Sequence, residues 1–177
     1  MACITGALWD LCTQGNNTGG IDEIKILSAD ELDSVTVDPA TSAITAITLT
    51  ATATVGFVDV DFQTEGADNT TEFAITNGAN VVGTNTLNFT TPKEDAPKYH
   101  FIEELLSCVC GVVIYYKDLN GEEWLIGSEG KKQRAYATTI TGTSGRAFED
   151  ENKIDWVFVA RGSFPKRNMT GVALPTV

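Results

Sequence analysis

The sequence is poor in the residues on which most enzymes and zinc sites depend. Its 177 residues include a single histidine, His100, and four cysteines. A catalytic triad or a histidine-based zinc site would have to use His100, and no nucleophile motif accompanies it. The phosphate-binding, dinucleotide-binding and metalloprotease motifs are missing too. We therefore expect a scaffold or assembly protein that is not an enzyme and carries no metal ion and no cofactor.

Positive charge is scarce in the first half of the chain. Residues 1–91 carry twelve acids and one base, Lys25, whereas residues 92–177 carry twelve acids and eleven bases. A protein that grips nucleic acid through its phosphates needs clustered Lys and Arg, so this function is disfavoured. Three interpretations stay open. The acidic part of one copy faces the basic part of another, the acidic surface repels a polyanion, or it only aids solubility.

Long apolar runs and a secretory leader are also missing. No run approaches the roughly 20 residues of a membrane-spanning helix. The first residues contain no basic segment and reach Asp10 early, unlike a signal peptide. We expect a protein that is not exported and has no membrane partner. With 42% hydrophobic and 20% charged residues, the composition is that of one globular domain.

The four cysteines, Cys3, Cys12, Cys108 and Cys110, leave three roles open. They would allow two disulfides, but no export signal supports an oxidising compartment. The spacing of Cys108 and Cys110 suits two thiolate ligands, although the other two cysteines do not complete a zinc pattern. Near the end of an apolar helix, cysteine is more commonly a small buried residue, and we favour that interpretation.

Short segments of alternating hydrophobicity predict a mainly β protein. The clearest alternation runs through Ile154–Ser163, and the tightest turn is Asp118–Gly121, where Asn-Gly predicts a hairpin. The predicted strands cover residues 21–28, 34–38, 43–55, 57–64, 70–76, 81–82, 87–91, 112–117, 122–127, 133–141 and 154–163. Strands and helices do not alternate, so we expect an antiparallel β-sandwich or half-barrel with one flanking α-helix.

One helix is predicted over about residues 97–110, with Asp95 as its N-cap and Gly111 as its stop. Its apolar stripe consists of Ile102, Leu105, Leu106 and Val109. The domain then spans residues 21–165, between a flexible N-terminal arm (1–20) and a C-terminal tail (166–177).

Asp59 and Asp61 form a carboxylate pair on one predicted strand. In Phe57–Thr64 the apolar side chains Val58, Val60 and Phe62 alternate with polar ones, which places both carboxylates on a solvent-facing side. A glycosidase would need such a pair in a cleft with aromatic platforms. An ordinary polar strand face explains the pair better.

The layout of about residues 20–165 resembles the tail tube (major tail) proteins of tailed bacteriophages. The resemblance rests on the acidic strand, the helix ending near Cys110, the hairpin Asn120–Gly127, the loop Glu149–Asn152 and the closing strand Trp156–Gly162. It implies a virion tail protein, made in the host cytoplasm, that forms hexameric rings. The rings stack into an acidic-lined tube through which DNA passes without specific binding.

The resemblance implies roles for particular residues. Asp59 and Asp61 would face the lumen, and loops 65–85 and 142–153 would lie between rings, with other tail proteins as further partners. Candidates for contacts between subunits are the charged residues of two late clusters: Lys131, Lys132, Arg134, Glu149, Asp150 and Glu151. The alternative is a capsid decoration, neck or carbohydrate-binding β-sandwich module, which would expose an aromatic site such as Trp124.

Overall fold

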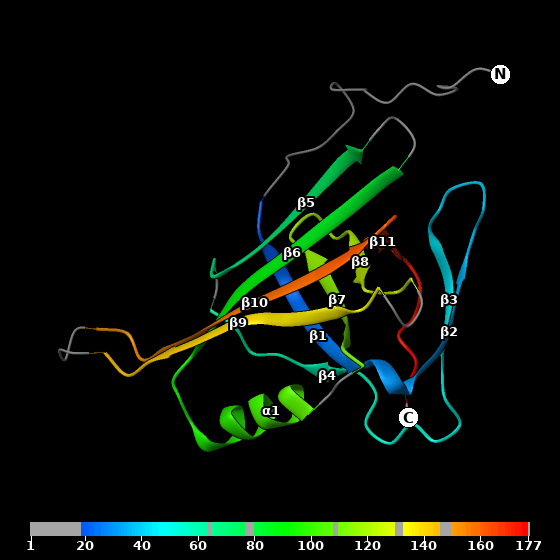
Figure 1. The fold of residues 1–177 in the computed structure, drawn as a ribbon. Helices are drawn as coiled ribbons and strands as arrows, with labels where there is room; N and C mark the ends of the chain where they lie inside the picture. The colour runs from blue at the N-terminus through cyan, green and yellow to red at the C-terminus, as the bar shows by residue number, and fades with distance from the viewer. Residues whose placement is uncertain are drawn as a thin grey trace.

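In the computed structural model, the described residues are 19–63, 65–76, 80–107, 110–129, 133–145 and 150–176. Within them the chain forms eleven β-strands, one short 3₁₀ turn and one α-helix (Figure 1). All strand pairs are antiparallel. The prediction of a mainly β, antiparallel fold with a single helix is confirmed.

Nine strands belong to one hydrogen-bonded sheet that has two parts, which cross one another in Figure 1. Strand pairing connects the two parts at a single residue pair, Val112 and Ala135. The first part contains β1 (Ile21–Ser28), β4 (Val58–Asp59), β7 (Val112–Asp118), β8 (Glu123–Ile126) and β11 (Lys166–Asn168). The second part is a four-stranded sheet in the order β9 (Ala135–Thr143), β10 (Lys153–Gly162), β6 (Asn80–Pro92) and β5 (Ala67–Thr76).

The main hydrophobic core lies between these two parts. On β10 the residues Ile154, Trp156, Phe158 and Ala160 are all buried, which confirms the predicted alternation. The rings of Trp156 and Phe158 each stack on Phe89 of β6 with centroids 5.8 Å apart. Aromatic side chains contribute large buried areas, so this stack fixes one face of the four-stranded sheet against β1 and β7.

A second core covers the opposite face of β1, β7 and β8. It is closed by the small sheet of β2 (Leu32–Val37) and β3 (Ile44–Leu49), which follows the 3₁₀ turn at Ala29–Glu31, and by the C-terminal segment. Strand β7 is therefore buried on both faces, as its apolar sequence predicts. No element was predicted after Pro165, yet β11 pairs with β8 there, and Met169 is fully buried.

Two glycines with positive φ stand at the junction of the two parts. A Cβ atom on Gly111 (φ 76°) would lie 2.8 Å from the Ala135 carbonyl oxygen. A Cβ atom on Gly127 (φ 78°) would lie 2.7 Å from the Ala135 nitrogen. Both positions need the left-handed conformation and the absence of a side chain, so glycine here allows the two parts to meet.

The helix α1 (Ala96–Ser107) lies on the edge of the main core, and none of its residues is fully buried. Asp95 caps it as predicted, since its carboxylate accepts a hydrogen bond from the Lys98 backbone N–H at 3.2 Å. Ile102 and Leu105 pack on the core, together with Phe101. The predicted stripe was wrong at Leu106, which is 77% exposed because one helix face alone touches the sheet. Val109 lies outside the described residues.

Several predicted strand boundaries were wrong. Strand β5 begins at Ala67, inside the predicted loop 65–69, and β6 joins two predicted strands into one. The predicted strand 57–64 reduces to the two residues of β4, and the predicted strand 43–55 ends at Leu49. One reason is Glu31, whose carboxylate accepts hydrogen bonds from the backbone of Thr54, Val55 and Gly56 and so holds this segment as a loop.

We predict that Gly127→Ala destabilises the protein more than Gly171→Ala. Both glycines have positive φ, but a Cβ on Gly171 meets nothing within 4 Å. Gly171→Ala should therefore lower the free energy of unfolding by only about 1 kcal/mol, through backbone strain. Gly127→Ala should cost more than about 2 kcal/mol, because it also displaces backbone at the junction. Urea denaturation measures both, and equal losses would contradict this account of the junction.

Candidate functional site: an uncovered sheet face and its two free edges

The four-stranded sheet has two edges with free backbone groups. Strand β5 is its last strand on one side. On the other side β9 pairs with β7 only at Ala135, so no described strand covers the edge from Tyr136 to Thr143. Free N–H and C=O groups along an edge are a template for pairing with another chain.

The two edges carry only part of the usual protection against such pairing. Monomeric proteins blunt edge strands with Lys, Pro, bulges or short length. The described part of β9 contains no charged residue, and β5 is ten residues long with neither Lys nor Pro. One bulge interrupts β9 near Thr138. The sequence thus leaves both edges available to a partner strand.

The side of this sheet that faces away from the core is polar. Alternation along each strand places threonines, Asn88 and several charged side chains on this open face. Its described members are Asp68, Thr70, Glu72, Ala74, Val82, Thr84, Thr86, Asn88, Thr90, Pro92, Tyr136, Thr138, Thr139, Thr141, Thr143, Lys153, Asp155, Val157, Val159 and Arg161.

Hydrogen bonds between neighbouring strands tie the polar side chains of the open face together. Asp155 accepts a hydrogen bond from the Thr90 hydroxyl at 2.7 Å, and Asp68 accepts one from the Asn88 amide at 3.1 Å. The open face carries three acids, Asp68, Glu72 and Asp155, and two bases, Lys153 and Arg161, so it is close to neutral and presents mostly hydroxyl groups.

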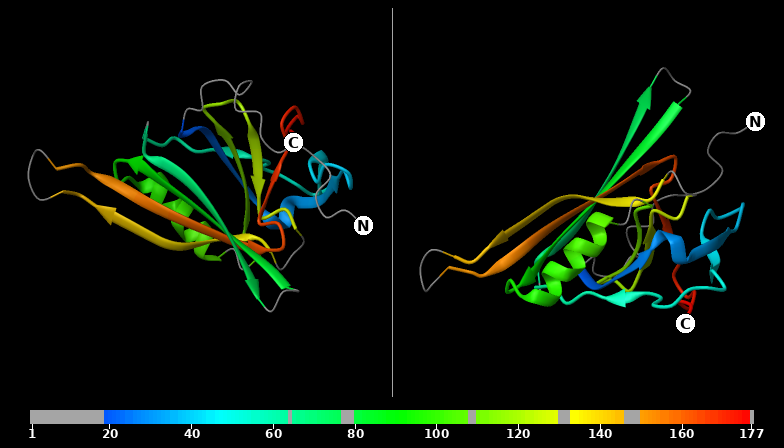
Figure 2. Two further views of the ribbon diagram at one scale, coloured as in Figure 1. Left: turned by 90° about the horizontal axis from the view of Figure 1, so that it is seen from above. Right: turned by 60° about the horizontal axis from the view of Figure 1, so that its bottom comes forward.

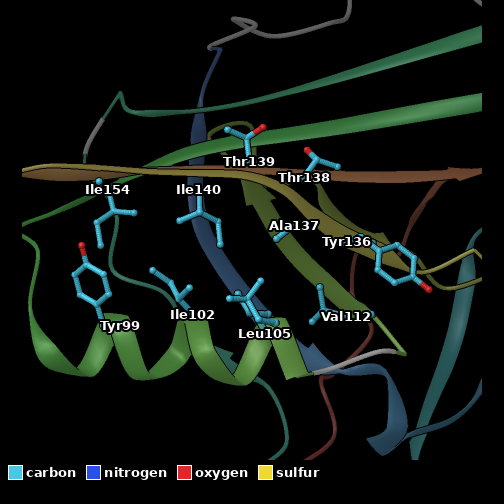
Figure 3. Close-up of a pocket in the computed structure, with 14 residues that line it drawn as sticks. Tyr99, Ile102, Leu105, Val112, Tyr136, Ala137, Thr138, Thr139, Ile140 and Ile154 are labelled. Carbon is cyan, nitrogen blue, oxygen red and sulfur yellow. The ribbon is translucent and has the colours of Figure 1, made fainter.

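The bulge in β9 also shapes an apolar groove beneath this edge of the sheet. Because Thr138 and Thr139 both point to the open face, Ala137 and Ile140 both point toward α1 (Figure 3). There they face Ile102 and other helix residues across a groove of about 430 Å³. The groove runs alongside the free edge of β9. A strand added at that edge would therefore also lie next to the opening of the groove.

Two hairpins project from opposite ends of the four-stranded sheet (Figure 2). The β5–β6 hairpin continues past the core, and its core-facing side stays apolar. Phe73, Ile75 and Val81 are 55%, 71% and 47% exposed there. We call these three residues the arm patch. Exposed apolar residues grouped on one projecting element are typical of an interaction surface.

The predicted acidic pair lies elsewhere. Asp59 belongs to β4, which pairs with β1, and Asp61 follows it outside any strand. Both are exposed, but the Asp59 carboxylate is 2.8 Å from the Lys25 amine, which also contacts Glu23 at 2.9 Å. Hydrogen bonds to Asp59 and Glu23 raise the pKa of Lys25, against the opposing effect of burial. Both carboxylates are exposed and line one cavity, as the alternation predicts, but only Asp59 has a basic partner among the described residues.

The other contact candidates differ in their accessibility. Arg134 is only 6% exposed and donates to the Gly127 carbonyl at 3.0 Å, so it is not available to a neighbour, and this prediction needs correction. Asp150 and Glu151 are exposed near the end of the β9–β10 hairpin, with Glu151 3.4 Å from Lys153. Lys131, Lys132 and Glu149 lie outside the described residues.

The remaining sequence candidates add no catalytic or metal-binding constellation among the described residues. His100 lies on the helix surface, and its nearest charged neighbour is Glu104 at 3.9 Å. No described group of His, Cys, Asp and Glu side chains is arranged to hold a metal ion. Of the cysteines only Cys110 is described, and it is exposed, so the interpretation as a buried residue is wrong at this position. The ring of Trp124 is half-buried beneath the Lys166 amine, 4.5 Å away.

No helix in the described part of the chain is both long and apolar enough to cross a membrane.

We predict that Asp59→Asn and Asp61→Asn have different effects on stability. Asp59→Asn removes the carboxylate that pairs with Lys25. It should lower the free energy of unfolding at pH 8 by about 0.5 kcal/mol, as expected for a partly exposed ion pair. The pKa of Lys25 is higher in the folded protein than in the unfolded chain, where it is about 10.4. The ion pair therefore stabilises the fold fully below that pH, and its contribution is lost as the pH rises through the higher pKa of the folded protein. The difference between wild type and Asp59→Asn should therefore shrink above about pH 10.5.

The matched control is Asp61→Asn, because Asp61 is exposed and has no hydrogen bond or ion pair in the described structure. It should leave the free energy of unfolding unchanged across this range. Chemical denaturation at several pH values measures both variants, and equal losses would refute the proposed difference between the two aspartates.

Comparison with known proteins found no match: no protein-family model, curated protein or solved structure is significantly similar to this chain.

Proposed function

We propose that this chain is a structural subunit that joins copies of itself edge to edge into a ring. The open face of the four-stranded sheet would line the channel of that ring. Stacked rings would form the tail tube of a bacteriophage virion, a conduit for DNA with other tail proteins at its ends. The observation that carries the proposal is a sheet with one uncovered polar face and two edges that no described strand covers.

Strand direction supports ring closure. Neighbouring strands alternate in direction through the order β9, β10, β6 and β5, so the two edge strands run in opposite directions. A copy related by rotation about the channel would place its β9 antiparallel to β5 of the first copy. Each added copy continues the alternation of strand directions around the ring. A head-to-tail contact between β5 of one copy and β9 of the next therefore closes the ring and leaves no strand edge unpaired.

The chemistry of the open face suits a channel for a polyanion. DNA would be slowed by many weak contacts with Lys or Arg, and the open face carries only two bases, Lys153 and Arg161, against the three acids Asp68, Glu72 and Asp155. These three acids replace Asp59 and Asp61 as the proposed lumen residues. The hydroxyl side chains between them are uncharged and so add no ionic attraction to the phosphates.

The projecting hairpins offer contacts between copies. The arm patch would bury its apolar side chains against a neighbouring subunit, and the β9–β10 hairpin with Asp150 and Glu151 would reach the next ring. Burial of Phe73 and Ile75, which are mostly exposed in the single chain, would stabilise the assembly by the hydrophobic effect.

The direct test is electron microscopy of the purified protein, with light scattering over a range of concentration and salt. The proposal predicts rings or tubes with a central channel. A monomer at every concentration and salt would overturn it.

We predict that the double variant Phe73→Lys, Ile75→Lys prevents assembly without unfolding the subunit. Both side chains are exposed in the single chain, so their replacement should change the free energy of unfolding by less than about 0.5 kcal/mol. Val55→Lys is the matched control, since Val55 is 65% exposed on the loop before β4. Light scattering should show assemblies for the control and monomers for the double variant. Assembly of the double variant would exclude the arm patch from the interface.

A further inference from the structure

Lys166 lies in a half-buried cluster of polar and aromatic side chains between the two parts of the sheet. It begins β11, yet its amine reaches across to β5, where Nζ is 3.0 Å from Oδ1 of Asn69. The Tyr116 hydroxyl is 2.9 Å from Nζ, and the Trp124 ring lies beneath the amine. The described structure places no carboxylate within ion-pair distance of this amine.

The side-chain amide of Asn69 is held and polarised by its neighbours. Its Oδ1 accepts hydrogen bonds from Tyr116 Oη and from Asn85 Nδ2, each at 3.0 Å, in addition to the contact with Lys166. Its Nδ2 donates to Asn85 Oδ1 at 2.9 Å, and Asn85 is fully buried. Several donors converging on one carbonyl oxygen are the arrangement that stabilises an oxyanion during acyl transfer.

The environment also favours the nucleophilic form of the amine. Burial lowers the pKa of Lys166, with Asp118 partly opposing this effect. A desolvated lysine is neutral more often than a surface lysine, and the neutral amine is the nucleophile. Asp118 lines the small cavity of about 300 Å³ onto which Lys166 and Asn69 open, so a carboxylate is present to exchange protons with water.

We propose that Lys166 and Asn69 are a modification site, joined after folding by an intramolecular isopeptide bond between Nζ and Cγ. The neutral Nζ attacks Cγ of Asn69, and the carbonyl electron pair moves to Oδ1, which Tyr116 and Asn85 stabilise. The tetrahedral intermediate collapses, the bond from Cγ to Nδ2 breaks, and Nδ2 leaves as ammonia with one proton taken from Nζ.

The reaction converts an amine and a primary amide into a secondary amide and ammonia. It therefore needs no oxidant, reductant or other co-reactant. The Tyr116 hydroxyl contacts both Nζ and Oδ1, so it provides a path for the proton.

The bond would link β11 to β5, two strands from different parts of the sheet that are 97 residues apart in the chain. Strand pairing between the two parts is limited to Val112 and Ala135, and the proposed bond would add a covalent cross-link between them. It would hold the four-stranded sheet in place under mechanical load. This inference does not depend on the proposed assembly, since every group involved comes from one chain.

The test is intact mass spectrometry of the purified, folded full chain, incubated at mildly alkaline pH. The expected mass is lower than the sequence mass by one molecule of ammonia. Proteolysis should then release a branched peptide that joins the segment containing Lys166 to the segment containing Asn69. A mass equal to that of the unmodified sequence after prolonged incubation would overturn the proposal.

Lys166→Arg provides the control, because arginine keeps the charge and the aromatic contact but lacks the nucleophilic amine. This variant should keep its full sequence mass, and wild type unfolded in urea should not react. Asparagine alone can also lose ammonia by cyclising onto its own backbone. A loss that persists in Lys166→Arg, or that yields only linear peptides, would therefore overturn the isopeptide assignment.

Discussion

Backbone N–H and C=O groups that lie along a strand edge have to find partners, and this requirement organises the whole molecule. In β1, β7 and β8 the neighbouring strands satisfy it. In the four-stranded sheet it is left open at β5 and along most of β9. Edge strands of ten and nine residues offer a long template for pairing, and we propose that a partner strand covers them.

The core explains how such a sheet stays rigid while it extends beyond the rest of the fold. The stack of Phe89, Trp156 and Phe158 anchors its middle, and glycines at the junction let strand pairing connect the two parts at one residue pair. Both hairpins then project without support from a core of their own. Rigidity at the centre and exposed apolar groups at the arm patch are the combination that assembly requires.

Local sequence patterns predicted the elements that local forces determine. The alternation of β10, the two-sided burial of β7 and the turn at Asp118–Gly121 could all be read from neighbouring residues. The interpretation of Asp59 and Asp61 failed to anticipate Lys25, because an ion pair across β1 and β4 depends on register rather than on spacing. The open face and the contact between Lys166 and Asn69 depend on strand order, which a single sequence does not encode in any local pattern.

The most direct measurement of the central claim is hydrogen–deuterium exchange at the backbone amides of β5 and β9, followed as protein concentration increases. If copies pair through these edges, the amides on the free sides of both strands become protected together, while protection of β7 stays constant. If exchange along β5 and β9 is as fast in concentrated as in dilute protein, the edges remain uncovered, and the account of the molecule as a self-assembling subunit is wrong.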